Sequence, residues 1–308
     1  MPFLFRRTST LAAMLALVLL VSGCSGGGKP SPGPASGPAP TPAGPVRVVV
    51  AASEVLVGSN RILLGINDPQ GNAISAAQAH LRFFPPGSKD TKPYAETDAV
   101  YLGNEQGVAK ALYSTRATFD RAGEWRMDAV VTPPGKKAMT VPASVFVMEK
   151  GYAPAVGQPF PPSHNQTAKD VPVEQLTSQR PVADPDFYML TVAAAEQQGK
   201  PFMIVVATPA FCETQTCGPQ LQSAQALRRR YADRLNFIHI EVFQRPDLLL
   251  EGKVQPQVNP ILLEWKLQTE PWVFLVDAQG KVFDRFEGYA PESELEASVQ
   301  RLLGAQAS

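Results

Sequence analysis

Two cysteines in the second half of the chain, Cys212 and Cys217, are the residues best suited to chemistry. A thiolate is a nucleophile and a metal ligand, and two thiols form a disulfide when their Cα atoms lie within about 7 Å. Residues five positions apart in a regular helix are separated by about 7.5 Å along its axis, so a bonded pair requires a loop. Gly218 and Pro219 follow and favour a helix that starts directly after them.

The third cysteine, Cys24, follows a segment typical of exported proteins. Arg6 and Arg7 precede an apolar run at residues 11–21, which is shorter than the roughly 20 residues that cross a bilayer. A positive start, a short apolar run and then small residues are the features of a signal peptide. We therefore predict a signal peptide over residues 1–23.

The sequence Val21-Ser22-Gly23-Cys24 resembles the lipobox of bacterial lipoproteins. This resemblance implies that Cys24 is lipidated and anchors an exported chain to the outer face of a membrane. Ser25 rather than Asp follows, which implies the outer membrane where the bacterium has one. An ordinary secretory signal with an incidental cysteine is the alternative. Lipidation would leave Cys212 and Cys217 as the remaining thiols, and such pairs persist as disulfides in exported proteins.

Charge and proline content limit the partners and the organisation of the chain. The 308 residues include 28 basic and 28 acidic side chains, so there is no basic excess to bind nucleic acid. Seven of the 30 prolines lie between Pro30 and Pro45. Residues 24–45 contain almost nothing that could form a core, so we predict a disordered Pro/Gly linker there. The remaining length suits two domains.

Residues 46–150 show the alternation of apolar and polar side chains that is typical of half-buried strands. Ala79, Leu81 and Phe83, for example, share one face. Turns rich in Pro and Gly separate about seven such segments, which predicts an all-β sandwich of the immunoglobulin-like type. The pattern is similar to small sandwich modules on exported bacterial proteins and implies spacing or partner binding. Residues 151–180 are predicted to be an interdomain linker.

Residues 181–304 alternate between helical and strand patterns. The continuous apolar run 202–207 is typical of a strand buried on both faces. Asp186 is the expected N-cap of the first helix and Gly199 its expected end. The patterns predict helices over 187–198, 220–232, 261–267 and 292–303, and strands over 202–207, 237–242, 272–276 and 281–286.

This order resembles thioredoxin-like proteins, because the cysteines lie between a buried strand and a helix, Pro271 opens a hairpin and Gly288 follows it. The resemblance implies an α/β thioredoxin-like fold with a cis Pro271 facing the cysteines. It implies that Cys212 is the attacking thiolate and Cys217 the resolving thiol, in a Cys-x4-Cys variant of the usual Cys-x-x-Cys. A second alignment, on Cys217-Gly218-Pro219, would make Cys217 the attacking residue. In either alignment a helix N-terminus lowers the pKa of the thiol.

Some residues depart from the thioredoxin pattern. The family's buried acid would fall near Val206 and is missing, and carboxylates at Glu213 and Glu270 would raise the pKa of a neighbouring thiol. A static disulfide, worth only about 2 kcal/mol for so small a loop, is one alternative. A Sco-type copper site built from Cys212, Cys217 and His239 is another, and a non-catalytic surface binding module is a third.

These features together predict a membrane-anchored, extracytoplasmic thiol–disulfide oxidoreductase. Its partners would be the membrane, through Cys24, and exported proteins that carry exchangeable thiols or disulfides. No cofactor is expected, because thiol–disulfide exchange moves electrons directly between sulfur atoms. The physiological substrate and the direction of electron flow do not follow from the residues.

Overall fold

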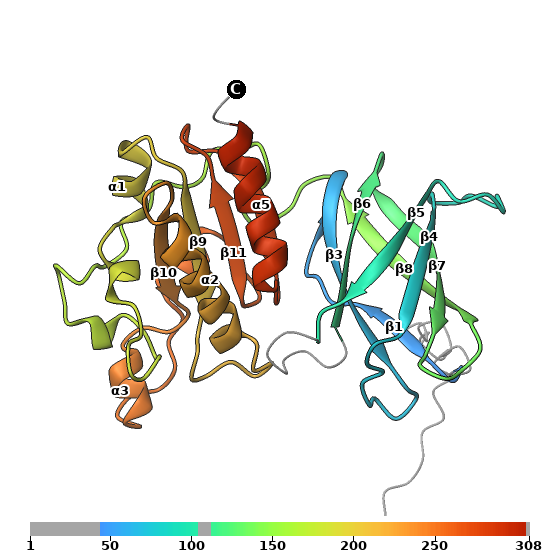
Figure 1. Ribbon diagram of the computed structural model, residues 1–308, viewed down its shortest axis with the longest axis horizontal. Helices are drawn as coiled ribbons and strands as arrows, with labels where there is room; N and C mark the ends of the chain where they lie inside the picture. The colour runs from blue at the N-terminus through green and yellow to red at the C-terminus, as the bar shows by residue number, and fades with distance from the viewer. Residues whose placement is uncertain (1–43, 104–111, 306–308) are drawn as a thin grey trace, which may run out of the picture. The chain divides into compact units, whose positions relative to one another are not determined.

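Residues 44–103 and 112–305 are described by the computed structural model (Figure 1). The predicted signal peptide, Cys24 and the predicted linker up to residue 43 lie outside this part of the chain. Within it, no helix is both long enough and apolar enough to cross a membrane. All of the described residues belong to one unit with dense internal contacts, so contacts between its two regions are part of the fold.

The N-terminal region, as far as it is described, consists of strands. They are β1 (Arg47–Val50), β2 (Val55–Leu56), β3 (Gly58–Asn67), β4 (Gln78–Phe84), β5 (Ala95–Tyr101), β6 (Leu112–Phe119), β7 (Gly123–Thr132) and β8 (Met139–Met148). They form one large sheet in the order β1-β3-β6-β5-β4-β7-β8-β2. β5 pairs antiparallel with both β4 and β6, and β1 contacts β8, so the sheet curls and encloses one face. The predicted all-β region is therefore confirmed.

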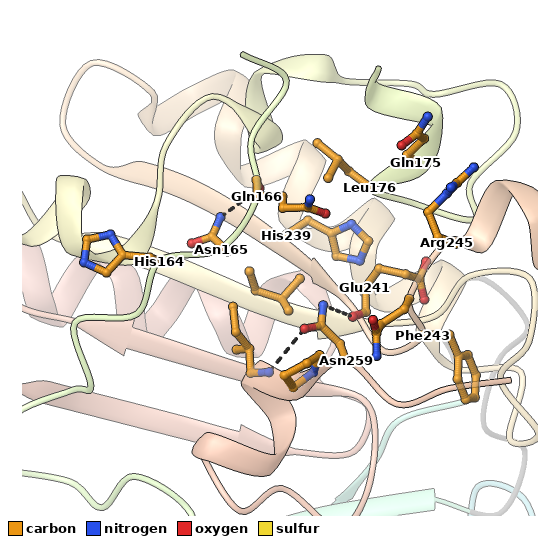
Figure 2. Close-up of a pocket in the computed structure, with 14 residues that line it drawn as sticks. His164, Asn165, Gln166, Gln175, Leu176, His239, Glu241, Phe243, Arg245 and Asn259 are labelled. Carbon is orange, nitrogen blue, oxygen red and sulfur yellow. Dashed lines mark hydrogen bonds between the residues drawn. The ribbon is translucent and has the colours of Figure 1, made fainter. Parts of the chain in front are cut away.

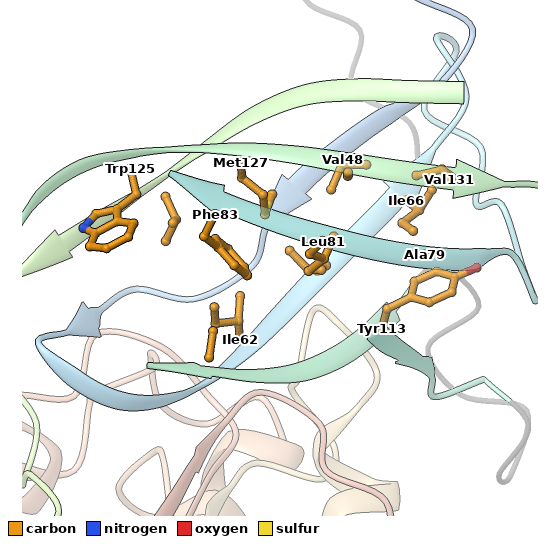
Figure 3. Packing of buried hydrophobic residues seen from close by; sticks show 14 of the residues in the cluster. Val48, Ile62, Ile66, Ala79, Leu81, Phe83, Tyr113, Trp125, Met127 and Val131 are labelled. Carbon is orange, nitrogen blue, oxygen red and sulfur yellow. The ribbon is translucent and has the colours of Figure 1, made fainter. Parts of the chain in front are cut away.

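The enclosed face of this sheet carries a hydrophobic core (Figure 3). Ala79, Leu81 and Phe83 on β4 are all buried in it, as their alternation predicts. The rings of Phe83 and Trp125 each meet Phe119 edge to face, with centroids 5.3 and 5.0 Å apart. Such aromatic pairs add to the stabilisation from buried apolar area, so this cluster fixes how the strands pack.

The C-terminal region contains a second sheet with helices on both faces. Its elements are two 3₁₀ helices (Val173–Gln175 and Pro185–Tyr188), α1 (Val192–Gln197), β9 (Phe202–Ala207), α2 (Cys217–Tyr231), β10 (Asn236–Glu241), α3 (Pro246–Leu250), α4 (Pro260–Glu264), β11 (Trp272–Val276), β12 (Val282–Glu287) and α5 (Glu292–Ala305). The strand order is β10-β9-β11-β12. β10 runs parallel to β9, whereas β11 is antiparallel to β9 and to β12.

Side chains along β9 alternate between two hydrophobic cores. Met203 and Val205 pack with α2 and α5, which lie on the same side of the sheet in Figure 1. Ile204 and Val206 pack on the other face with residues of α1 and α4. Because both faces are covered, every residue of β9 is buried, which accounts for its uninterrupted apolar sequence.

The predicted helix over 187–198 is wrong as a single element. The chain forms a 3₁₀ turn that ends at Tyr188 and begins again as α1 at Val192. Two caps cause this break. The Asp184 carboxylate accepts the Asp186 N–H, and Thr191 Oγ1 accepts the Ala194 N–H at 2.9 Å. Asp186, the expected N-cap, therefore lies inside the first turn instead.

Helix α2 begins at Cys217 rather than at the predicted Gln220. Pro219 is accommodated because it lies in the first turn, where the backbone N–H groups have no partner within the helix. The consequence is that Cys217 belongs to the helix and Cys212 to the preceding loop. The loop that a bonded pair requires therefore spans only the residues between Cys212 and Cys217.

An ion pair that is partly buried joins the all-β region to the C-terminal region. Arg61 on β3 donates to both carboxylate oxygens of Glu294 at 2.8 and 2.9 Å, and only 3% of its side chain is exposed. Its remaining contacts are to the carbonyl oxygens of Glu287 and Tyr289 at 2.8 and 2.6 Å. Leu63 packs beside them against Tyr289. A planar guanidinium bound in this way sets one geometry between the two regions.

Candidate functional site

The two cysteines lie at the carboxyl end of β9, on either side of the start of α2. The Gln215 N–H donates to the Cys212 carbonyl oxygen at 3.1 Å, and Gln215 adopts a left-handed φ of 60°, which closes a tight turn. Cys212 is partly exposed at this turn, whereas Cys217 is 0% exposed. Both thiols are free, so the structure describes the reduced pair.

The Cys212 sulfur is surrounded by hydrogen-bond donors that favour its thiolate. Thr214 Oγ1 lies 3.2 Å from Cys212 Sγ and 2.7 Å from Thr216 Oγ1. The Cys217 thiol, the Thr214 hydroxyl and the backbone N–H groups of Cys217 and Thr216 together lower the pKa of Cys212 to about 5, although burial opposes this change. The two N–H groups belong to the start of α2, as expected for a thiolate at a helix N-terminus.

Cys217 has the opposite chemistry. Its thiol donates to Cys212, and this bond together with burial raises the pKa of Cys217 far above that of a free cysteine. At neutral pH the pair therefore holds one thiolate, on the accessible sulfur, and one proton, on the buried sulfur. A sulfur that is both charged and accessible is the one that can attack a partner.

The two carboxylates near the cysteines do not prevent this ionisation. Burial raises the pKa of Glu270, and the negative charges of Cys212 and Glu213 raise it further. The sequence suggested that these acids would raise the pKa of the neighbouring thiol. For Cys212 the hydrogen bonds outweigh this effect, whereas for Cys217 the charge of Glu270 adds to the raised pKa.

Pro271 lies at the same end of the sheet as the cysteine loop. The Glu270–Pro271 peptide bond is cis, and β11 begins directly after it. Trp272 pairs with Val206 near the carboxyl end of β9, so the strand register places Pro271 beside the loop that carries Cys212. The Gly288 N–H donates to the Pro271 carbonyl oxygen at 2.8 Å and holds this loop against the end of β12.

His239 does not join the cysteines, which corrects the copper-site alternative. Its Nε2 lies 3.0 Å from the Ala207 carbonyl oxygen and its Nδ1 lies 2.9 Å from the Tyr188 hydroxyl, so both ring nitrogens are occupied. Burial lowers the pKa of His239 to about 4, which keeps the ring neutral. Figure 2 shows it beside Glu241 in a separate pocket. Across residues 44–103 and 112–305 no three His, Cys, Asp or Glu side chains are grouped to hold a metal.

A buried acid does occur near this end of the sheet, but on a different strand from the expected one. Glu241 is the last residue of β10 and pairs with Ala207 of β9. Its carboxylate accepts the Ser178 N–H at 2.7 Å and the Val242 N–H at 2.9 Å, while burial raises its pKa. The family pattern predicts this acid near Val206, so Glu241 was not predicted. The available signal was a charged residue that ends an otherwise apolar strand.

Comparisons with known proteins concern the fold of the C-terminal region. A family model described as a thioredoxin-like domain matches residues 189–303. The C-terminal region is a thioredoxin-like domain. Three solved structures match part of the chain. A thiol:disulfide interchange protein of the thioredoxin family from Chlorobium tepidum TLS is 17% identical, covers 37% of this chain and 86% of its own, and has a TM-score of 0.30.

The other two structures are similar at comparable levels. A thioredoxin-like protein in the oxidised form is 15% identical over 43% of this chain and 97% of its own, with a TM-score of 0.30. StoA from Bacillus subtilis is 16% identical over 33% of this chain and 83% of its own, with a TM-score of 0.26. No curated protein matches the chain in sequence. In this domain Cys212 lies in the loop between β9 and α2, and Cys217 is the first residue of α2.

Proposed function

We propose that the chain is a thiol–disulfide oxidoreductase in which Cys212 attacks and Cys217 resolves. The observation that carries this proposal is the division of roles between two neighbouring thiols. The accessible Cys212 has its pKa lowered to about 5, while the buried Cys217 keeps its proton. A structural disulfide does not require two thiols with different pKa values. Exchange requires one thiolate that attacks the partner and a second thiol that later resolves the mixed disulfide.

In the reductive direction, the Cys212 thiolate attacks one sulfur of a partner's disulfide. A bond to Cys212 forms as the partner's disulfide breaks, and the second partner sulfur leaves as a thiolate that takes up a proton from water. Cys217 then gives its proton to water and attacks Cys212, which forms the Cys212–Cys217 disulfide and releases the first partner sulfur. Two electrons pass from the cysteine pair to the partner, and the oxidative direction is the reverse.

The matched variants Cys212→Ser and Cys217→Ser test this assignment. With an insulin-type protein disulfide as substrate, both variants should lose turnover, because the cycle needs both sulfurs. Only Cys217→Ser should accumulate a mixed disulfide with the substrate, since its attacking thiolate remains but nothing resolves the adduct. Non-reducing electrophoresis followed by mass spectrometry detects this adduct. An adduct with Cys212→Ser instead would reverse the roles, and turnover by either variant would overturn the mechanism.

The same proposal locates the protein outside the cytoplasm, on a lipid anchor at Cys24. Lipid on this cysteine should hold the wild-type protein in the membrane fraction, because two or more acyl chains give stable anchoring. A Cys24→Ala variant should lose incorporation of labelled palmitate and appear in the soluble fraction. Equal palmitate incorporation by both proteins would contradict the anchor without touching the redox assignment.

A further inference from the structure

A pocket of about 400 Å³ lies beside the cysteine loop, and the two regions of the chain build it together. Thr214 lines it from the cysteine loop and Glu270 from the loop that carries Pro271. The opposite wall is apolar and comes from the all-β region, where Ala51, Ala52 and Leu63 line it. The pocket therefore lies between the loops that carry Cys212 and Pro271 and a surface of the all-β region, which is not part of the thioredoxin-like domain.

The pocket is close enough to the reactive sulfur to contact any substrate that reaches it. Thr214, one of its lining residues, lies 3.2 Å from Cys212 Sγ. Consecutive Cα atoms are about 3.8 Å apart, so a residue next to a substrate cysteine lies within reach of this pocket during attack. An apolar wall of this size favours an apolar side chain, because burial removes its surface from water.

Hydrogen bonds fix the wall relative to the loop that carries Pro271. The Ser53 N–H donates to both carboxylate oxygens of Glu287 at 2.8 and 2.9 Å. Thr269 donates its hydroxyl proton to the same carboxylate at 2.7 Å, and Trp272 Nε1–H donates to Thr269 at 3.0 Å. Because this chain of bonds runs from one region to the other, the wall is positioned before a substrate arrives.

The negative charge at the pocket excludes acidic peptide segments as partners. Its lining contains Glu270 and Glu287 but no Lys or Arg, and the exposed Glu213 and the Cys212 thiolate lie next to it. Like charges at short range disfavour binding, so an acidic segment would be repelled here. A neutral or basic segment meets no such penalty.

We propose that this pocket is a substrate subsite, which receives an apolar side chain adjacent to the reactive cysteine of a partner's non-acidic peptide segment. The all-β region thus supplies one wall of the substrate site. This inference rests on the proposed exchange function and adds the class of segment that is exchanged.

Two disulfide peptides that differ in one residue test the subsite. Each carries a single cysteine joined to 2-mercaptoethanol, with leucine next to the cysteine in one peptide and serine in the other. The wild-type protein should react with the leucine peptide about tenfold faster, as one apolar group in a pocket typically gives. Hydroxyethyl disulfide, which has no side chain to bind, measures the exchange chemistry alone.

Ala51→Trp should fill the pocket and bring the leucine preference close to onefold, with each peptide rate expressed relative to the same variant's rate with hydroxyethyl disulfide. Ala51 is exposed and bonds to Leu63 only through its backbone N–H, so the strand pairing survives the substitution. Ala51→Glu provides a second variant, and its added charge should also remove the preference. Ala73→Trp is the control, because Ala73 is exposed in an isolated β-bridge with Asn67, outside the pocket, and the preference should persist.

The outcomes separate the two proposals. No leucine preference in the wild type, or an undiminished preference in both Ala51 variants, would overturn the subsite while exchange with hydroxyethyl disulfide still supports the proposed function. Failure to react with hydroxyethyl disulfide would overturn the function and the subsite together.

Discussion

Alkylation of the reduced protein by iodoacetamide should follow the ionisation of Cys212 with a midpoint near pH 5, because its pKa is lowered to about 5. At pH 6 about nine-tenths of such a thiol is ionised, against less than about 1% of a free cysteine with a pKa near 8.5. Intrinsic nucleophilicity falls as the pKa falls, so the midpoint of the profile is the quantity to measure. The thiolate absorbance at 240 nm gives it independently.

Variants at the donors should move this midpoint upward in a set order. Cys217→Ala removes the largest contribution and should raise the pKa of Cys212 the most, whereas Thr214→Val removes one hydroxyl and should raise it less. Glu213→Gln is the matched control in the same loop, because Glu213 donates nothing to Cys212, and it should not raise the midpoint. A wild-type midpoint above pH 8, or equal midpoints in all variants, would remove the basis for Cys212 as the attacking thiolate.

The same ionisation links the stability of the reduced protein to pH. The folded state releases the Cys212 proton near pH 5, while an unfolded chain holds it until about pH 8.5. Between these values the unfolded state binds more protons, so this group makes the free energy of unfolding rise with pH. The contribution is complete above about pH 8.5 and is lost as the pH falls through 5. The size of this contribution is the part of the pH dependence of the unfolding free energy that the wild type shows and Cys212→Ser lacks.

Replacing Arg285 by methionine should destabilise the protein by about 3–5 kcal/mol, the usual cost of leaving a buried charge without its partner. Arg285 on β12 pairs with Glu54, whose side chain is 1% exposed, and its own side chain is 12% exposed. Glu54 also accepts the Tyr152 N–H at 2.6 Å, so it cannot turn toward water without breaking that bond. The free energy of unfolding from denaturant titration measures the loss.

An exposed pair of the same residue types provides the control for Arg285→Met. Arg121 is 60% exposed and bonds to its neighbour Asp120, so Arg121→Met should change stability by less than about 1 kcal/mol. A double variant, Glu54→Gln with Arg285→Met, should recover part of the loss because no unpaired charge remains buried. If Arg285→Met and Arg121→Met lowered the free energy of unfolding equally, the buried Glu54–Arg285 pair would contribute no more to stability than an exposed pair.

The parts of the fold that depend on local pattern could be predicted from the sequence. Strands β9 and β11 have the predicted bounds, because a short, continuous apolar run is typical of a strand buried on both faces. The prediction of one helix over 187–198 was wrong because caps at Asp184 and Thr191 start two separate elements. Either residue could equally begin one continuous helix, so the sequence alone does not reveal the break. Local pattern therefore identifies buried strands better than it identifies where short helices end.

The parts that depend on distant residues could not be predicted. Arg61 and Glu294 are 233 positions apart, and the sequence contains no sign that they meet. His239 is a candidate metal ligand by sequence, but the hydroxyl of Tyr188, 51 positions away, occupies its Nδ1. The spacing of Cys212 and Cys217 predicted a loop between them, but the donation from Thr214 depends on how that loop turns. Periodicity and spacing in the sequence therefore do not predict which side chains pair across the fold.

The complete burial of Cys217 has a consequence for the kinetics of the proposed cycle. Electrons can enter and leave the pair only through Cys212, so the protein that is acted on and the protein that restores the pair must visit the same sulfur in turn. They cannot be bound there at once, and each should act as a competitive inhibitor of the other's half-reaction. Turnover should therefore show parallel double-reciprocal plots, the signature of a ping-pong sequence.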